Sequence, residues 1–195
     1  MSPIDVYPIH TIPPEPWRNG GGITRTIATG GAQWRVSLAS IKRDGPYSRF
    51  AGMSRVSFIL RGNGVKLQNR DTVVWLRPLV AEAYDGDEIW DATLIDGPTL
   101  ALNVMTEKDR YRANVKLVNE PVVVQPGCAV IAIALDRGCA FAHGADAVDG
   151  AVMSGNVLVS ELHALPLRLA PQFSSADSAG YEPYAVLVTI EPASV

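Results

Sequence analysis

Short runs rich in valine, isoleucine, leucine and threonine recur along this chain from residue 23 onward, separated by clusters of glycine, proline, asparagine and aspartate. Strands of this kind with turn residues between them are typical of sandwiches and barrels. No window of about 11 or more residues shows the apolar spacing of an amphipathic helix. The chain is therefore predicted to be all-β, with very little helix. The expected strands are Ile23–Thr29, Gln33–Ile41, Arg55–Arg61, Thr72–Leu76, Ile89–Ile95, Leu100–Thr106, Ala113–Val118, Val122–Gln125, Ala129–Leu135, Val157–Leu162, Pro166–Leu169 and Tyr184–Ile190.

The two halves of the chain share a weak echo. Phe58–Gly62 resembles Ile133–Gly138, and each segment ends one strand pattern and precedes further strand–turn–strand units. The length of 195 residues accommodates one large all-β domain or two small ones. We expect two related modules, an N-terminal one at 1–106 and a C-terminal one at 107–195. The glycines of Arg61–Gly64 predict a tight hairpin between two strands of the first module.

The segment Pro16–Gly22 combines an indole, a guanidinium, an amide and three consecutive glycines. Three glycines in a row cost conformational entropy, so the fold needs backbone without side chains there. They either let another strand pass closely or leave backbone N–H groups open to an anionic ligand. Trp17 supplies a flat apolar wall, and Arg18 and Asn19 supply polar contacts, a mixture typical of small-molecule sites. Two interpretations stay open: a ligand-binding loop, or a turn whose tryptophan plugs the end of a barrel.

The stretch Gln33–Ala39 alternates between apolar and more polar residues. Trp34, Val36 and Leu38 share one face of the expected strand, and Arg35, Ser37 and Ala39 share the other. If the second face lined a barrel interior, Arg35 and Ser37 would be polar groups inside a pocket. The alternative is a solvated sheet face, which is common in antiparallel sheets.

The first half carries an ordered series of motifs along roughly residues 8–106. They are Pro16-Trp17-Arg18-Asn19-Gly20-Gly21-Gly22-x-Thr24, Trp34-Arg35-Val36-Ser37-Leu38-Ala39, Asp44-Gly45-Pro46-Tyr47-Ser48, Arg55, Leu60-x-Gly62-x-Gly64, Gly86-Asp87, Gly97-Pro98 and Asn103-Val104-Met105. This series closely resembles the HutD/Ves family. Each motif alone is common, and the ordered set is fairly specific. The rest of the chain fits the family in its strand pattern.

The resemblance implies a bicupin: two double-stranded β-helix barrels of the RmlC-like cupin type, with the shared residues in the first. It also implies a role in bacterial histidine utilisation (the HutD branch) or in stress response (the Ves branch). The family has no firmly established reaction and looks like a group of small-molecule binders, with formylglutamate or urocanate among the suggested ligands. The chain departs from the family pattern at Arg18, where lysine is typical, and at Ala101, where an acidic residue is common.

We therefore expect a metal-free protein that binds a small carboxylate metabolite in its N-terminal barrel, with no cofactor. Trp17 is expected to pack against the ligand, while Arg18 or Arg35 pairs with its carboxylate. Amide and hydroxyl side chains are expected to add neutral hydrogen bonds, and the glycines to let the backbone approach. The candidate ligand-binding residues are Trp17, Arg18, Asn19, Gly20, Gly21, Gly22, Thr24, Arg35, Ser37, Arg55 and Asn103.

Histidine is scarce, and its placement argues against a metal site. Most enzymatic cupins bind a metal through an HxH pair, a nearby glutamate and a later histidine, which converge on one face. This chain has only His10, His143 and His163, with no HxH pair. His163 is expected at the end of a strand in a structural or surface role. Neither a G-x-S-x-G elbow nor a cysteine beside a histidine is present, so no metal and no catalytic residue is assigned.

Charge and composition limit the partners and the compartment. The net charge is −3 with no basic run, so nucleic acid is not an expected partner. Cys128 and Cys139 are too few for a disulfide framework and are expected as small apolar side chains in a reducing compartment. The sequence shows no signal peptide, and its longest apolar run is too short to span a bilayer. We expect a cytoplasmic protein with no membrane partner, and a homodimer is compatible with the sequence.

Two other functions stay open, and the sequence does not decide whether the chain is an enzyme, although the balance favours a binding protein. The first is a cofactor-free isomerase or hydrolase, whose carboxylate base would come from the turn residues Asp44, Asp87 or Asp96. It predicts a titratable group with a shifted pKa beside Arg35. The second is an interaction or regulatory protein without a ligand site, in which Trp17 and Arg35 are fully packed.

Overall fold

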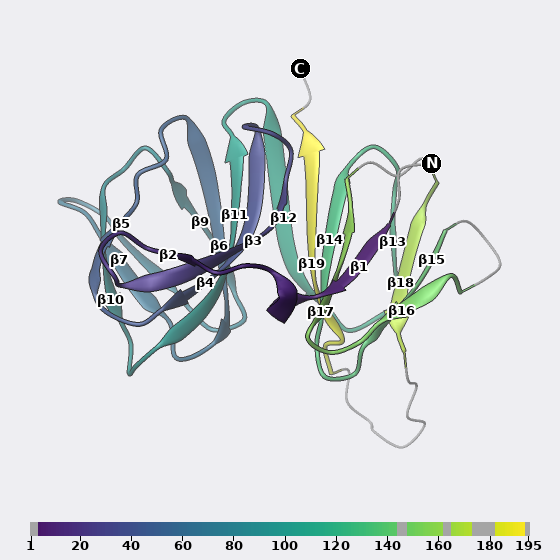
Figure 1. The fold of residues 1–195 in the computed structure, drawn as a ribbon. Coiled ribbons are helices and arrows are strands. Elements are labelled where there is room, and N and C mark those ends of the chain that lie inside the picture. The colour runs from purple at the N-terminus through teal and green to yellow at the C-terminus, as the bar shows by residue number, and fades with distance from the viewer. Residues whose placement is uncertain (1–3, 144–147, 162–164, 173–181, 194–195) are drawn as a thin grey trace. The chain divides into compact units, whose positions relative to one another are not determined.

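The computed structural model describes residues 4–143, 148–161, 165–172 and 182–193. These residues form nineteen strands, and the one helical element among them is the short 3-10 turn η1 (Ile9–Thr11) (Figure 1). The all-β prediction is confirmed. Within the same described ranges, no helix has the length and apolar character needed to cross a membrane.

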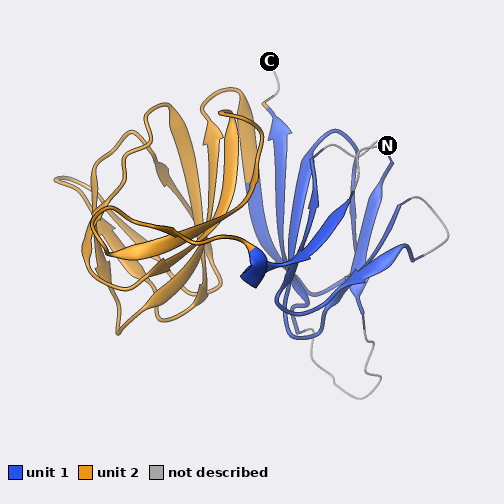
Figure 2. Cartoon of the chain, viewed as in Figure 1, with its two compact units in different colours: residues 1–11, 114–192 blue, residues 12–113, 193–195 orange. Residues whose placement is uncertain are grey.

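The chain divides into two compact units (Figure 2). We call Ile12–Ala113 with Ala193–Val195 the N-terminal barrel, and Met1–Thr11 with Asn114–Pro192 the C-terminal barrel. The expected boundary at residue 106 differs from this division for two reasons. It would fall inside strand β11 (Thr99–Glu107), and it would separate strand β1 (Asp5–Pro8) from its antiparallel partner β17 (Asn156–Ser160).

The N-terminal barrel is built from two antiparallel sheets. One has the strand order β2 (Glu15–Pro16), β3 (Gly22–Thr29), β4 (Trp34–Ile41), β11, β6 (Met53–Arg61) and β9 (Ala81–Asp85). The other has the order β5 (Gly45–Tyr47), β10 (Trp90–Leu94), β7 (Val65–Gln68) and β8 (Val73–Leu76). Apolar side chains of both sheets form its core, with Ile41, Ile59, Leu67 and Leu76 fully buried.

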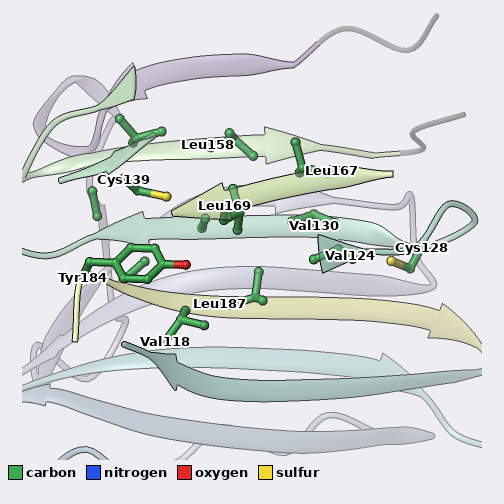
Figure 3. Close-up of a cluster of buried hydrophobic side chains, with 14 residues drawn as sticks. Val118, Val124, Cys128, Val130, Cys139, Leu158, Leu167, Leu169, Tyr184 and Leu187 are labelled. Carbon is green, nitrogen blue, oxygen red and sulfur yellow. The ribbon is translucent and has the colours of Figure 1, made fainter. Parts of the chain in front are cut away.

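The C-terminal barrel has the same two-sheet construction. One sheet has the order β1, β17, β14 (Ala129–Ala134), β19 (Ala185–Pro192) and β12 (Tyr111–Val118). The other has the order β13 (Val122–Val124), β18 (Leu167–Pro171), β15 (Cys139–His143) and β16 (Gly150–Val152). Its core is a cluster of aliphatic side chains with Tyr184 and both cysteines (Figure 3). Both cysteines are buried and unpaired, and burial raises the pKa of the Cys139 thiol to about 12.

The two barrels repeat one topology of eight consecutive strands. In chain order, β4 to β11 correspond to β12 to β19. The sheet order β4-β11-β6-β9 then matches β12-β19-β14-β17, and β5-β10-β7-β8 matches β13-β18-β15-β16. The sequence echo of Phe58–Gly62 and Ile133–Gly138 falls at the ends of the equivalent strands β6 and β14. The echo therefore marks a structural repeat.

The turn Arg61–Gly64 does not form the hairpin that its glycines predict. It joins β6 to β7, and these strands belong to different sheets, so the turn carries the chain across the barrel. Gly62 and Gly64 have φ of 94° and 113°. A Cβ on Gly64 would lie 2.4 Å from the carbonyl oxygen of Leu76. The glycines serve this close crossing, and a tight hairpin needs the same residues, which is why the sequence did not distinguish the two.

Candidate ligand-binding site

A cavity of about 670 Å³ lies within the N-terminal barrel. One wall is formed by β3, β4, β11 and β6, and the rest comes from residues 15–19 ahead of β3 and residues 46–50 around the end of β5. The lining residues are Glu15, Pro16, Trp17, Arg18, Asn19, Thr24, Arg35, Ser37, Ala39, Pro46, Tyr47, Ser48, Phe50, Arg55, Asn103 and Met105.

Strand register sets the polar side chains of this wall in two rows. Ser37, Asn103 and Ser57 lie opposite one another across β4, β11 and β6. In the next row, Arg35 and Arg55 lie on either side of Met105 of β11. Of the two alternatives for the polar face of β4, the structure therefore shows the first: this face lines the barrel interior.

Arg55 is buried without a counter-ion. It is 4% exposed, and its guanidinium carbon lies 4.9–5.3 Å from the ring centroids of Tyr47, Phe50 and Tyr84. Its Nη1 donates a hydrogen bond to the Ser48 carbonyl at 3.2 Å. Within the described part of the chain, no carboxylate lies within ion-pairing distance of it. A buried charge is costly unless it is paired, and here three aromatic rings and one carbonyl stand in place of a counter-ion.

Three buried polar atoms of cavity-lining residues lack hydrogen-bond partners among the described residues. They are the Nε atoms of Arg35 and Arg55 and the hydroxyl of Tyr47. Burial raises the pKa of Tyr47, so its hydroxyl keeps its proton at neutral pH. Buried polar atoms in native proteins nearly always have partners. These three atoms are almost inaccessible to solvent, so they lie just behind the cavity surface and keep unused hydrogen-bonding capacity there.

Arg35 belongs to a second polar cluster at the rim of the cavity. Its Nη2 donates to the Thr26 hydroxyl at 2.8 Å and lies 3.8 Å from Glu15 Oε2. The Thr26 hydroxyl in turn donates to Glu15 Oε1 at 2.9 Å. Arg35 thus has a weak, exposed counter-ion, whereas Arg55 has none in the described ranges. The deeper guanidinium is the stronger candidate for a ligand carboxylate.

The Pro16–Gly22 loop is folded on itself and contributes its side chains to the cavity. Trp17 donates from its indole nitrogen to the Thr24 hydroxyl at 2.8 Å, and its ring packs edge-on against Tyr47 with centroids 6.1 Å apart. Asn19 Oδ1 accepts a hydrogen bond from the backbone N–H of Gly21 at 2.9 Å. The loop therefore fills the end of the barrel core and lines the cavity at the same time.

The three glycines of this loop do not line the cavity, and Gly22 allows the close approach of a neighbouring strand. A Cβ on Gly22 would lie 2.5 Å from the carbonyl oxygen of Ser40. Gly20 has φ of 65°, and its carbonyl accepts a hydrogen bond from Arg43. None of the three glycines is among the lining residues.

The structure gathers most of the predicted site residues in one place. Trp17, Arg18, Asn19, Thr24, Arg35, Ser37, Arg55 and Asn103 line the cavity, and Gly20, Gly21 and Gly22 do not. Sequence reasoning missed Tyr47, Ser48 and Phe50, although the first two stand in a quoted family motif. It also missed Glu15, which directly precedes the Pro16–Gly22 segment, and Met105, which lies opposite Arg35 on the neighbouring strand.

The other ionisable candidates lie away from the cavity. Asp44 accepts a hydrogen bond from the backbone N–H of Leu94, Asp87 pairs with Lys108, and neither lines the cavity, nor does Asp96. His143 lies 3.2 Å from Asp149 in the C-terminal barrel. His163 lies outside the described residues. Among the residues that the structure describes, no three His, Cys, Asp or Glu side chains are grouped to hold a metal ion.

Three positions of the C-terminal barrel that correspond to this wall are apolar. The sequence echo aligns Ala132 with Ser57, and the two pair with Leu187 and Asn103 in their respective sheets. On this alignment, Arg55, Ser57 and Asn103 correspond to Val130, Ala132 and Leu187. The last three are 1% exposed or less and belong to the core drawn in Figure 3. The buried arginine, serine and asparagine of the N-terminal barrel are therefore not repeated at these positions.

A salt-bridge cluster outside the cavity holds the 48–52 loop, which contributes Ser48 and Phe50 to the surroundings of Arg55. Asp87 accepts a hydrogen bond from the Gly52 N–H at 2.9 Å and another from Lys108 Nζ at 2.6 Å. Its backbone carbonyl accepts one from Arg49 Nε at 2.7 Å. The hydrogen bond from Lys108 is the main cause of a lowered pKa at Asp87. Asp87 is thus an external tether for one cavity wall.

Replacing Asp87 with alanine is expected to increase hydrogen exchange selectively in residues 48–52, because the side-chain tether is lost. Hydrogen-exchange mass spectrometry measures this, with D91A as the control at an exposed position of β10. The lowered pKa of Asp87 means that the tether is complete above the ordinary value of 3.8 and is lost as pH falls through the lowered one. The protection factors of this loop, relative to the intrinsic exchange rate at each pH, should therefore fall at acidic pH in the unmodified protein, and unchanged exchange in D87A at neutral pH would refute the tether.

Comparison with known proteins gives consistent matches along the chain. A family model described as HutD matches residues 9–174. Protein Ves of Escherichia fergusonii is 30% identical over 183 residues, which covers 84% of this chain and 96% of that protein. A conserved protein of unknown function from Pseudomonas aeruginosa PAO1 has 27% identity and a TM-score of 0.81, covering 99% of this chain and all of that one.

Two further solved structures confirm the fold. HutD from Pseudomonas fluorescens SBW25 matches with a TM-score of 0.77 at 23% identity, covering 97% of this chain and 99% of that one. Oxalate decarboxylase of Lactobacillus farciminis, solved as a formate complex, matches with a TM-score of 0.60 at 9% identity over 95% of this chain and 85% of that one. Together with the repeated eight-strand topology, these matches confirm the double cupin prediction.

Proposed function

The chain belongs to the HutD family, and from this premise we propose that its N-terminal barrel binds a small molecule through a carboxylate group. The observation that carries the proposal is Arg55: a guanidinium that is 4% exposed, lies at the cavity wall and has no counter-ion in the described ranges. A carboxylate can accept two parallel hydrogen bonds from the guanidinium fork. The Nε of Arg55 and the hydroxyl of Tyr47 are buried behind this wall and have no partner among the described residues.

The surroundings of Arg55 strengthen an ion pair at this position. Three aromatic rings hold the guanidinium away from bulk water, and in such an environment the attraction to an anion is less screened than at the surface. The rings and the Ser48 carbonyl also fix the arginine in place before a ligand arrives. A preorganised group loses little entropy on binding, which favours affinity for even a small ligand.

Within this proposal, the physiological ligand is a metabolite of histidine utilisation or of the process served by Ves, as the family resemblance implies. Formylglutamate and urocanate are the first compounds to test because both carry carboxylates. The cavity of about 670 Å³ falls in the size range of small-molecule sites. Val130 of the C-terminal barrel stands at the position of Arg55, which supports placing a site built around this arginine in the N-terminal barrel.

A thermal-shift screen with formylglutamate, urocanate, glutamate and histidine tests the proposal. A ligand present at a hundred times its Kd stabilises the folded state by about 2.7 kcal/mol, which corresponds to roughly 5–10 °C in Tm for a chain of this size. The R35A variant should weaken the shift because it changes the cavity rim. R77A serves as the control, since Arg77 pairs with Glu82 and does not line the cavity. The absence of a shift with every carboxylate would refute the proposal.

One observation favours the enzyme alternative. Glu15 is the one carboxylate of the described residues that lines the cavity, and it lies beside Arg35 at the open rim. It could act as a base toward a ligand held at Arg55. The candidate bases expected from the sequence, Asp44, Asp87 and Asp96, lie outside the cavity. Consumption of a screened compound by the wild-type protein but not by E15Q would support this alternative.

A further inference from the structure

We propose that Tyr84 and Ser57 fix the direction of the Asn103 amide, so that Asn103 donates into the cavity and the ligand carries a second hydrogen-bond acceptor in addition to its carboxylate. This inference rests on the proposed function and deepens it. Tyr84 and Ser57 do not line the cavity, so their role is to position Asn103.

The three side chains form one buried hydrogen-bonded chain. Asn103 Oδ1 lies 2.6 Å from Ser57 Oγ, and Ser57 Oγ lies 2.9 Å from the Tyr84 hydroxyl. All three residues are buried, with exposures of 5%, 1% and 8%. The distance of 2.6 Å is typical of an O–H···O bond and short for an N–H···O bond. It therefore favours a serine hydroxyl that donates to the amide oxygen.

The positions of the protons follow from what each atom can do. The amide oxygen of Asn103 only accepts, so the single hydroxyl proton of Ser57 points toward it. Ser57 then accepts from Tyr84, whose pKa is raised by burial and whose hydroxyl therefore keeps its proton. The amide nitrogen of Asn103 has no partner among the described residues, and Asn103 lines the cavity. This nitrogen is the group that the ligand meets.

Rotating the amide by half a turn would break this arrangement. The amide nitrogen would then donate to Ser57, and Ser57 would either donate to the Tyr84 hydroxyl or accept from it as well. In either case one of the two hydroxyl protons would be left buried without an acceptor in this chain of three side chains. A buried unsatisfied donor costs free energy, so Ser57 and Tyr84 together favour the donor-inward direction of the amide. A ligand with a donor at this point would meet a second donor and bind weakly.

Two probes that differ in one acceptor test the inference: 4-oxopentanoate, which carries a ketone oxygen, and pentanoate, which does not. The wild-type protein is expected to bind 4-oxopentanoate about fivefold more tightly, as one neutral hydrogen bond allows. In Y84F and S57A, this preference should fall to about twofold or less while the Kd for pentanoate changes little. Titrations followed by NMR give the affinity of each protein for each probe. Y111F is the control, since its hydroxyl bonds Gln33 outside the cavity.

Each outcome bears on the inference separately from the proposed function. Equal affinities of the two probes for the wild-type protein would overturn the inference and leave carboxylate binding intact. Failure of both probes to bind would contradict both proposals. Equal weakening of both probes in Y84F would show that Tyr84 has only a structural role. Because Y84F keeps the ring that packs on Arg55, it decides the question even if S57A does not fold.

Discussion

Replacing Arg55 with methionine is expected to weaken carboxylate binding strongly without lowering the stability of the unliganded protein. Hydrogen bonds to a charged group contribute about 1.5–3 kcal/mol, so the ligand Kd should rise roughly 10- to 150-fold. In the free protein, the guanidinium has no counter-ion among the described residues and its Nε has no partner. Methionine fills the space between the three rings with an unbranched chain and favourable sulfur–aromatic contacts. If R55M is as stable as the unmodified protein, Arg55 does not stabilise the free fold, and its burial has a functional reason.

Thermal denaturation of R55M with and without ligand measures both the loss of binding and the stability of the free protein. A ligand concentration of about 1 mM is a hundred times a Kd of ~10 μM. R55K is the informative companion, because lysine keeps the positive charge and loses the fork. It should bind at intermediate strength. A ligand-induced shift in R55M equal to that of the unmodified protein would exclude Arg55 as the carboxylate partner. A marked loss of stability without ligand would instead identify its aromatic contacts as structural.

Replacing Gly22 with alanine is expected to destabilise the N-terminal barrel and displace Trp17. The new Cβ would lie 2.5 Å from the carbonyl oxygen of Ser40, a backbone atom of the neighbouring strand, and 3.2 Å from the Trp17 ring. Insertions of this kind into packed structure cost about 1–3 kcal/mol, which corresponds to a fall in Tm of roughly 3–10 °C. The variant should also change tryptophan fluorescence, because the indole lines the cavity.

The matched control is G21A in the same loop. There the new Cβ would meet only the side-chain oxygen of Asn19 at 3.1 Å, which can shift by a few tenths of an ångström. A Tm within about 1 °C of the unmodified protein is expected for G21A, as for most substitutions away from strained or packed positions. Equal effects of the two variants would contradict the assignment of Gly22 to close strand approach.

The sequence predicted the polar wall of the cavity because that wall follows a local rule. Arg35 and Ser37 alternate with apolar residues, and alternation along a strand places them on one face. Arg55 entered through the family motif alone. Nothing local in the sequence indicated that it would be buried, because its cage combines Tyr47 from another sheet with Phe50 and Tyr84. Such contacts depend on how the barrel closes.

The misplaced boundary and the missing hairpin have a related cause. The pairing partner of β1 is β17, which lies about 150 residues further along the chain. No local sequence pattern indicates this pairing. The glycines of Arg61–Gly64 satisfy a tight hairpin and a crossing between sheets equally well. In both cases the local residue pattern is compatible with the observed structure, but strand pairing between distant segments determines the topology.

The long sequence separation between β1 and its partner strand has a consequence for folding during synthesis on the ribosome. Asp5–Pro8 leave the exit tunnel about 150 residues before Asn156–Ser160, with which they pair. At roughly 5–20 residues per second, β1 waits about 8–30 s for its partner while residues 12–113 of the N-terminal barrel are translated. The C-terminal barrel therefore cannot close until long after its β1 strand has been made, and a fragment cut at residue 106 would carry away an edge strand of that barrel.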